Sequence, residues 1–121
     1  MKIILNKTKK RISAFENNKE IGYLTFYYPD DAAGSRNMEF CWLYINSEYR
    51  RKGIATKLIK EFLKNFKNIV WVSFWTGKDL EKEKAYGLYK KLGFEQKAFQ
   101  EDYYEKGVGT RLFVKRIKKD L

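Results

Sequence analysis

A short basic segment, residues 44–56, has the residue types and spacing to hold a phosphate group. It reads as the end of an apolar strand, a loop with one glycine, and the start of an amphipathic helix. The first backbone N–H groups of a helix have no partner within the helix, and the helix dipole adds partial positive charge there. Arg50, Arg51 and Lys52 add full charges, and Gly53 lets an anion approach the backbone closely. The segment predicts a phosphate or pyrophosphate site; the alternative is an ordinary basic strand–helix turn.

This segment matches neither of the two best-known nucleotide-binding loops. A Walker loop needs four residues between its glycines followed by Gly-Lys-Ser/Thr, and a dinucleotide-binding fold needs Gly-x-Gly-x-x-Gly. Neither pattern is present, so the anion site rests on the pattern Arg50-x-x-Gly53-x-Ala55.

The amino-acid composition excludes several kinds of catalytic site. The sequence has no histidine, which removes the commonest general base and the commonest metal ligand. With a single cysteine, Cys41, a zinc site is not expected, and Ser-His-Asp and Cys-His mechanisms are excluded. The lone cysteine has no internal disulfide partner, which fits a reducing compartment. We expect Cys41 to be a small buried residue rather than a nucleophile.

The length and charge of the chain limit the class of protein. A chain of 121 residues, 44% hydrophobic and 17% aromatic, is expected to form one globular domain with its own core. No apolar run approaches the length of a membrane span and the N-terminal segment is too short for a signal peptide, so we expect a soluble cytoplasmic protein. The net charge of +11 attracts anions in general. Because the charge is spread along the chain, we favour a solvated surface over a nucleic-acid-binding patch, which stays the alternative.

Hydrophobic periodicity predicts the elements that must position the basic loop. The expected strands are 2–6, 11–16, 20–28, 38–45, 69–75, 94–100 and 109–117, and the expected helices are 54–66 and 80–92. The strand over 38–45 is nearly all apolar, which predicts a central strand covered on both faces. The order strand, helix, strand from residue 38 to residue 75 predicts a right-handed parallel βαβ unit. Residues 101–107 are expected to form a polar loop.

Two motifs together resemble the GNAT superfamily of acyl-CoA N-acyltransferases. The pyrophosphate loop of that family has the pattern Gln/Arg-x-x-Gly-x-Gly/Ala, which residues 50–55 match. A second family stretch, Asn-x-x-Ala-x-x-Leu-Tyr-x-Lys-x-Gly-Phe, is similar to residues 82–94. The matching residues there are Ala85, Leu88, Tyr89, Lys91, Gly93 and Phe94. The two motifs stand in the family's order, with a helix and a strand between them.

The resemblance implies the acyl-CoA N-acyltransferase fold. This is an α/β fold with a mixed, mostly antiparallel central sheet, a parallel splayed strand pair and two helices. Lys82 stands where the family usually has Asn, and Ser47 stands where it often has Pro. No helical period appears before residue 54, so the two helices that usually lie between the first and second strands are expected to be missing or reduced. We therefore expect an acceptor site that is open or completed by a partner subunit, which makes a homodimer a candidate.

The resemblance also implies a reaction, the transfer of an acetyl group from acetyl-CoA to an amine acceptor without a metal. The pyrophosphate and pantetheine groups of the co-substrate would lie on the third long strand and the basic loop. The residues implied are Leu43, Tyr44, Ile45, Arg50, Arg51, Lys52, Gly53, Ile54, Ala55 and Thr56. Tyr89 matches the family's tyrosine and is the candidate general acid toward the departing thiolate. The alternative for Tyr89 is an ordinary core tyrosine on a helix stripe.

Without a histidine, the base that accepts the amine proton must be a carboxylate, a tyrosine or water. Glu39 is the best candidate because it lies on the strand that leads to the basic loop, and an apolar setting would raise the pKa of its carboxyl. The alternative is that Glu39 lies at an exposed strand entry. Glu101, Asp102 and Glu105 could instead bind a cationic acceptor. Two other functions stay open, the modification of nucleic acid or charged tRNA and a non-catalytic CoA-binding or regulatory module.

Overall fold

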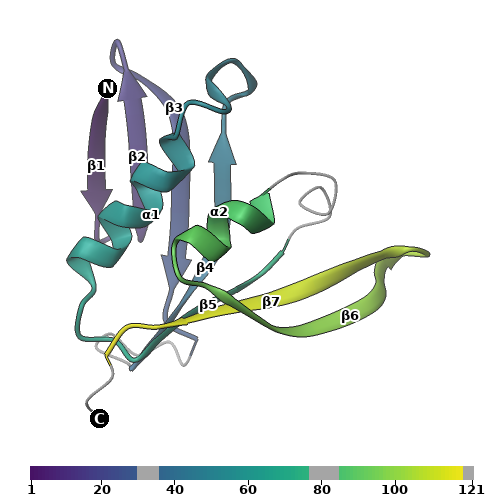
Figure 1. The fold of residues 1–121 in the computed structure, drawn as a ribbon. Coiled ribbons are helices and arrows are strands. Elements are labelled where there is room, and N and C mark those ends of the chain that lie inside the picture. Colours follow the sequence, from purple (N-terminus) through teal and green to yellow (C-terminus); the bar gives the residue numbers. More distant parts are fainter. Residues whose placement is uncertain (30–35, 77–84, 119–121) are drawn as a thin grey trace.

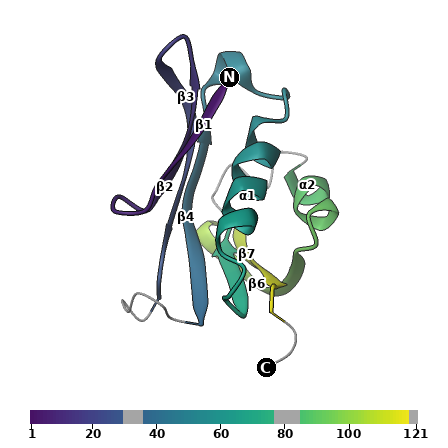
Figure 2. The same cartoon turned by 90° about the vertical axis from the view of Figure 1, so that its left-hand side faces the viewer.

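The computed structural model describes residues 1–29, 36–76 and 85–118. Within these ranges seven strands form one sheet in the order β1-β2-β3-β4-β5-β7-β6 (Figure 1). The strands are β1 (Lys2–Asn6), β2 (Arg11–Glu16), β3 (Lys19–Tyr27), β4 (Asn37–Ile45), β5 (Trp71–Trp75), β6 (Glu95–Glu105) and β7 (Val108–Arg116). The helices are the 3-10 turn η1 (Ser47–Tyr49), α1 (Ile54–Asn65) and α2 (Ala85–Lys91). Figure 2 shows α1 and α2 on the same side of the sheet.

The strand directions confirm the predicted mixed sheet. All neighbouring strands run antiparallel except β4 and β5, which α1 connects and which run parallel. The first two strands are joined only by residues 7–10, where the Lys10 N–H donates to the Lys7 carbonyl over 3.3 Å. The expectation that no helices separate the first and second strands is therefore confirmed.

The core lies between the sheet and the apolar stripe of α1. Ile54, Leu58, Ile59 and Phe62 recur at helical spacing and are all buried, as the periodicity predicts. The Phe62 ring is fully buried and meets the ring of Phe40 on β4 edge-on, with 4.9 Å between centroids. Aromatic packing of this kind fixes the helix on the sheet.

The second helix ends where the sequence predicts. The Gly93 N–H donates to the Lys90 carbonyl and the Phe94 N–H donates to the Tyr89 carbonyl, which is the hydrogen-bond pattern of a Schellman cap. The backbone at Gly93 is left-handed, with φ of 89°. The cap turns the chain so that Phe94 is buried. The start predicted for this helix, residues 80–84, lies outside the described residues.

The prediction that the strand over residues 38–45 is covered on both faces is wrong. Met38 and Phe40 face the helices and are buried, but the Trp42 side chain is 68% exposed and Tyr44 is also exposed. The reason is that both helices lie on one side of the sheet, and none of the described residues covers the other. We call this uncovered surface the open face. Its side chains on β3, β4 and β5 are Tyr23, Thr25, Tyr27, Glu39, Trp42, Tyr44, Ser73 and Trp75.

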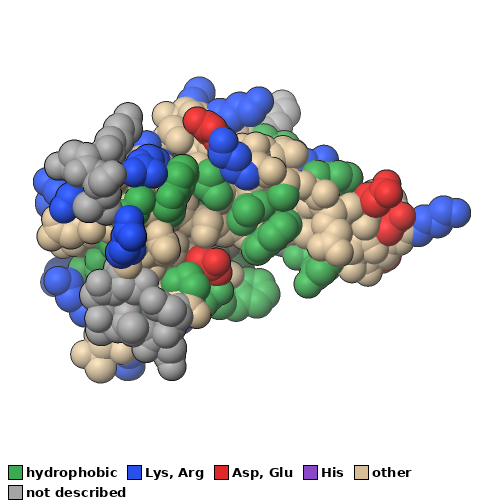
Figure 3. Space-filling model, turned by 90° about the horizontal axis from the view of Figure 1, so that it is seen from below, with side chains coloured by type: hydrophobic (Ala, Val, Ile, Leu, Met, Phe, Trp, Pro, Cys, Tyr) green, Lys and Arg blue, Asp and Glu red, His purple; other side chains and the backbone are tan. Residues whose placement is uncertain are grey.

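The polar loop predicted over residues 101–107 is also wrong. Strand β6 continues to Glu105 and β7 begins at Val108, so the two form a long hairpin that projects from the body (Figure 1). Both faces of the outer part of β6 are exposed, so its sequence carries no apolar alternation that would reveal a strand. Acidic side chains gather toward the projecting end, on the right of Figure 3. In the described parts of the chain, neither helix is long and apolar enough to cross a membrane.

The burial of Phe62 predicts a large effect on stability. We expect Phe62→Ala to lower the free energy of unfolding by about 3–5 kcal/mol, because it removes a fully buried ring from the centre of the core. Urea unfolding followed by circular dichroism measures the change. The matched control is Lys60→Ala on the exposed side of the same helix, which should change the free energy by no more than about 0.5 kcal/mol. Equal losses for both variants would contradict the packing described here.

Candidate active site

The site begins where two parallel strands part. In the described part of the chain, β4 and β5 pair over three residues only, and the last pair is Glu39 with Ser73. Beyond that pair β4 continues alongside β3, whereas β5 continues alongside β7. The rings of Phe40 and Phe74 stack just past the parting point, with centroids 5.6 Å apart, and fill the space on the helix side. The backbones of β4 and β5 therefore diverge in a V with Glu39 at its apex, and we call this divergence the opening.

A β-bulge on β4 lies just past the apex. Thr25 pairs with Trp42 and Phe26 pairs with Phe40, which leaves Cys41 as the extra residue. Cys41 is exposed in the bulge, so the expectation of a small buried cysteine is wrong. The sequence could not predict this exposed position for two reasons. A bulge depends on the register of the neighbouring strand, and the apolar run around Cys41 hides the change of face.

The hydrogen bonds of β4 indicate which of its amides face the opening. The Trp42 N–H donates to Thr25 Oγ1 over 3.0 Å, and the Asn46 N–H donates to the Ile21 carbonyl over 2.8 Å, so both point toward β3. Successive backbone groups of a strand point to opposite sides. The N–H groups of Leu43 and Ile45 therefore point toward the opening, where a ligand could pair with them like an added strand.

The basic loop lies at the wide end of the opening. It consists of η1, the exposed residues 50–52 and Gly53, which is the N-cap of α1 with φ of 78°. A non-glycine residue is strained at this φ, although a Cβ there would meet nothing within 4 Å. Among the residues that the structure describes, no side chain caps α1, and its first turn has no acidic residue, so the first N–H groups and the helix dipole are left for an anion. The Arg50 Nε donates to the Ile45 carbonyl over 3.1 Å, which places its guanidinium beside the end of β4.

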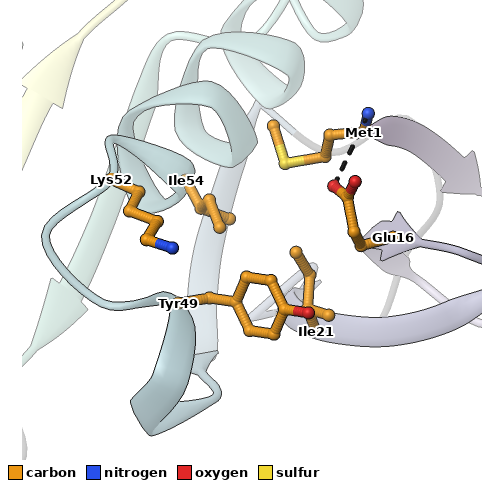
Figure 4. Close-up of a pocket in the computed structure, with 6 residues that line it drawn as sticks. All are labelled: Met1, Glu16, Ile21, Tyr49, Lys52 and Ile54. Carbon is orange, nitrogen blue, oxygen red and sulfur yellow. Dashed lines mark ion pairs between the residues drawn. The ribbon is translucent and has the colours of Figure 1, made fainter.

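A second hollow of about 380 Å³ lies on the other side of the same loop (Figure 4). Its lining comes from Met1, β2, β3, the loop and the first residue of α1, and includes none of β4, β5 or α2. The terminal ammonium of Met1 pairs with the Glu16 carboxylate over 3.6 Å there. The Lys52 side chain is directed to this side, with its Nζ 5.4 Å from the centre of the Tyr49 ring. A hollow with a carboxylate in its wall does not suit a diphosphate, and only the backbone of Lys52 is placed for the anion site.

The predicted general acid lies on the helix side of the opening. Tyr89 is on α2 and is buried, with an exposed fraction of 3%. Its ring meets Phe74 of β5 edge-on at 4.6 Å and tilts against Phe113 of β7 at 5.4 Å. The aromatic packing holds the ring beside β5, which forms one arm of the opening. This position is compatible with both roles expected for Tyr89, the general acid and the core tyrosine.

The predicted general base lies on the open face. Glu39 is half-buried between Tyr27 of β3 and Ser73 of β5, and the Tyr27 hydroxyl donates a hydrogen bond to its carboxylate. This hydrogen bond, with partial burial and the charge of Glu39, raises the pKa of Tyr27 to about 12. The surroundings of Glu39 are more polar than the apolar setting expected from the sequence. The reason is that Phe40 points to the opposite face and Cys41 lies in the bulge.

Sequence reasoning missed Tyr27 as a partner of the candidate base. The available signal was the alternation of β3, which places Tyr23, Thr25 and Tyr27 on one face, but the partner strand's register was needed to join Tyr27 to Glu39.

The acidic residues predicted as an alternative acceptor site, Glu101, Asp102 and Glu105, lie near the end of the hairpin, where Asp102 accepts a hydrogen bond from the Gly107 N–H over 2.7 Å. Among the described residues, no three His, Cys, Asp or Glu side chains are grouped to hold a metal ion.

Solved structures share this arrangement of strands and helices. The ribosomal-protein-S18-alanine N-acetyltransferase of Escherichia coli is 13% identical, with a TM-score of 0.79 over 92% of this chain and 70% of that chain. An aminoglycoside 6'-N-acetyltransferase complexed with coenzyme A is 16% identical, with a TM-score of 0.75 over 95% of this chain and 77% of that chain. An Elizabethkingia anophelis GNAT acetyltransferase with acetyl-CoA bound is 18% identical, with a TM-score of 0.72 over 88% and 74%. At these identities the likeness concerns the fold.

The sequence itself also matches a known domain. No curated protein matches the chain. The family model of the GNAT acetyltransferase domain, however, matches residues 9–96, which include β4, the basic loop, α1, β5 and α2. Because this match covers well over half of the chain and falls on the elements that form the opening, the chain belongs to the GNAT acetyltransferase family.

Proposed function

We propose that this protein is an acetyl-CoA-dependent N-acetyltransferase that transfers the acetyl group directly to an amine. One observation carries the proposal. The opening between β4 and β5 runs from an uncapped basic helix start at one end to a carboxylate, Glu39, at its apex. The first end suits a diphosphate and the second suits an amine that must lose a proton. Two solved structures of the same fold hold coenzyme A or acetyl-CoA, which supports this choice of co-substrate.

The basic loop and β4 would hold the co-substrate. The diphosphate would accept hydrogen bonds from the N–H groups of residues 51–56, with the Arg50 guanidinium alongside. The pantetheine arm would pair with the amides of Leu43 and Ile45, which point into the opening. Tyr44 would contribute neither group, because its amide points toward β3, like those of Trp42 and Asn46, and its side chain lies on the open face. Metal-binding chemistry plays no part in this proposal.

The chemistry would take place near the bulge of β4. The amine nitrogen attacks the thioester carbonyl carbon from the open face, and the C–N bond forms while negative charge develops on the oxygen. Backbone N–H groups that face the opening can stabilise this charge. The C–S bond then breaks, the amine proton passes to the Glu39 carboxylate, and Tyr89 donates a proton to the departing thiolate. No covalent intermediate with the protein is needed, which fits a chain without histidine.

The first prediction concerns binding of the co-substrate. We expect Arg50→Ala to raise the Kd for acetyl-CoA about tenfold, because it removes a full positive charge beside the uncapped start of α1. Isothermal titration calorimetry at low and high salt measures the change. The control is Lys60→Ala, a basic residue exposed on the same helix, which should leave the Kd within about twofold. If the wild-type protein gave no heat with millimolar acetyl-CoA, the proposed function would be wrong.

A second prediction tests Glu39 as the base. We expect Glu39→Gln to lower kcat about 100-fold while the Kd for acetyl-CoA stays unchanged, because the amide keeps the shape but accepts no proton. Steady-state release of the free thiol at several pH values measures the effect. An unchanged kcat would assign the proton to water or another group.

The Tyr27 hydroxyl provides a finer test of the same site. Tyr27→Phe should lower kcat less than Glu39→Gln, because it removes the group that positions the carboxylate and leaves the carboxylate itself. Since the pKa of Tyr27 is raised to about 12 from its usual 10, the hydroxyl stays protonated, and the difference in stability between wild type and variant should be constant from neutral pH up to pH 10. It should shrink as the pH rises from 10 toward 12. The control is Tyr23→Phe, which lies on the same face of the same strand.

A third prediction separates catalysis from binding alone. Tyr89→Phe keeps the ring that packs on Phe74 and Phe113, so the protein should fold and bind acetyl-CoA as before. If Tyr89 protonates the thiolate, kcat should fall at least tenfold. Stopped-flow measurement of thiol release, with calorimetry as the folding and binding check, gives both quantities. Unchanged release would favour the core role of Tyr89, and no release from either protein across a panel of amines would favour a non-catalytic CoA-binding module.

A further inference from the structure

A separate pocket of about 300 Å³ lies between the end of β5 and the β6–β7 hairpin. Its lining residues are Trp75, Gln100, Tyr103, Tyr104 and Thr110. Three of these five are aromatic, and their rings are exposed by 48%, 58% and 41% for Trp75, Tyr103 and Tyr104. The pocket therefore presents aromatic surface to solvent where a soluble protein ordinarily buries it.

The pocket is held in shape by an irregularity in the hairpin. Gln100 pairs with Thr110 and Glu105 pairs with Val108, so residues 101–104 bulge out opposite the single residue Gly109. A Cβ at Gly109 would lie 2.6 Å from the Gln100 carbonyl oxygen, so the strands can approach here only because this residue is glycine. Bulges re-aim the side chains that they carry, and this one carries Tyr103 and Tyr104.

A hydrogen-bond network joins the bulge to the end of β5. The Tyr104 hydroxyl donates to the Thr76 carbonyl over 2.9 Å, and the Thr110 hydroxyl donates to the same oxygen over 2.8 Å. The Arg111 N–H donates to the Thr76 hydroxyl over 2.9 Å. Thr76 and Thr110 are both buried, so the network fixes Tyr104 beside Trp75 before any ligand arrives. The Tyr103 and Tyr104 rings stand perpendicular, with centroids 5.0 Å apart.

The charge around the pocket is opposite to that of the whole chain. Between residues 98 and 110 there are three acidic residues and one basic residue that faces solvent near the turn: Glu101, Asp102, Glu105 and Lys106. Two cations flank this segment. Lys97 pairs with Glu95 over 3.1 Å, and the Arg111 guanidinium lies over the Phe99 ring, 4.7 Å from its centre, and donates to the Tyr86 hydroxyl over 2.6 Å. The chain as a whole carries +11.

Exposed aromatic faces with acidic residues nearby suit a cation. An ammonium group is attracted to aromatic faces, and the effect is largest where several rings surround it. The Gln100 side-chain oxygen can accept one of the ammonium hydrogen bonds. An anion or a neutral apolar group would gain nothing from the acidic hairpin.

The pocket is also at a suitable distance from the candidate base. Glu39 lies opposite Ser73, and Trp75 is two residues farther along the same strand and on the same face. Two residues of strand correspond to about 7 Å. A short alkyl chain that has one amine at Glu39 can therefore place a second amine among the three rings.

We propose that the pocket formed by Trp75, Tyr103 and Tyr104 binds the distal ammonium of the acceptor, which makes the acceptor a linear aliphatic diamine or polyamine. This inference rests on the proposed acetyltransferase function. One amine reacts at the apex of the opening, and the second, unreacted amine selects the substrate.

The test compares three acceptors that share the reacting amine: 1,5-diaminopentane, n-pentylamine and 5-aminopentan-1-ol. We expect kcat/KM for the diamine to exceed that of the other two by about tenfold, because only the diamine places a cation in the pocket. Trp75→Ala and Tyr103→Ala should each remove most of this preference. Both should leave kcat/KM for n-pentylamine within about twofold, which also shows that the variants are folded. The matched control is Glu95→Gln, which removes a negative charge from the same strand away from the pocket.

A binding measurement separates this proposal from the proposed function. The indole N–H resonances of the three tryptophans can be assigned with Trp75→Phe, and the Trp75 resonance should shift with 1,5-diaminopentane and not with n-pentylamine. Such a shift without acetyl transfer to any amine would support the pocket and overturn the acetyltransferase. Transfer with equal kcat/KM for the three acceptors and no shift would overturn the pocket and leave the acetyltransferase in place. Better transfer to a lysine-containing peptide than to the diamine would also overturn the pocket's proposed ligand.

Discussion

The parting of β4 from β5 after three residue pairs is the constraint on which the rest of the structure depends. An interior strand with unpaired amides is costly unless something else pairs with them. The structure holds the two arms apart by other means: α1 connects them, the stacked rings of Phe40 and Phe74 lie between them on the helix side, and each arm keeps its own outer neighbour. The amides that face the opening are thereby kept for a ligand, and the basic loop supplies the charge that attracts one.

The one-sided arrangement of helices has a second effect. With only residues 7–10 between β1 and β2, the face of the sheet away from α1 and α2 has no described cover, and side chains such as Trp42 and Trp75 are exposed there. On this face the Tyr27–Glu39 hydrogen bond and the aromatic pocket lie on neighbouring strands. We infer that the acceptor approaches from this side, opposite to the side on which α1 and α2 hold the strands apart. The same exposure leaves room for a partner subunit, as the sequence suggested.

Much of the fold could be predicted because local signals agreed with one another. The apolar stripe of α1, the glycine that ends α2 and the strand–helix–strand order each specify local geometry, and together they give the parallel pair and the basic loop. The features that could not be predicted depend on register. The contact of Tyr27 with Glu39 exists only because the bulge at Cys41 shifts β3 against β4 by one residue, and no local pattern specifies that shift. Likewise, β6 has polar residues on both faces, so its strand and the pocket that it forms with Trp75 carry no periodic signal.

The long hairpin also places β6 at the edge of the sheet, where β7 is its one neighbour among the described strands. A free edge of this length is a template on which other chains can add strands, and it invites aggregation. Five of the eleven residues of β6 are charged: Glu95, Lys97, Glu101, Asp102 and Glu105. Asp102 interrupts the strand further with a left-handed backbone, φ of 56°. The irregularity that shapes the aromatic pocket thus also makes the edge a poor template, so a more regular hairpin would lose the pocket and gain a tendency to form fibrils.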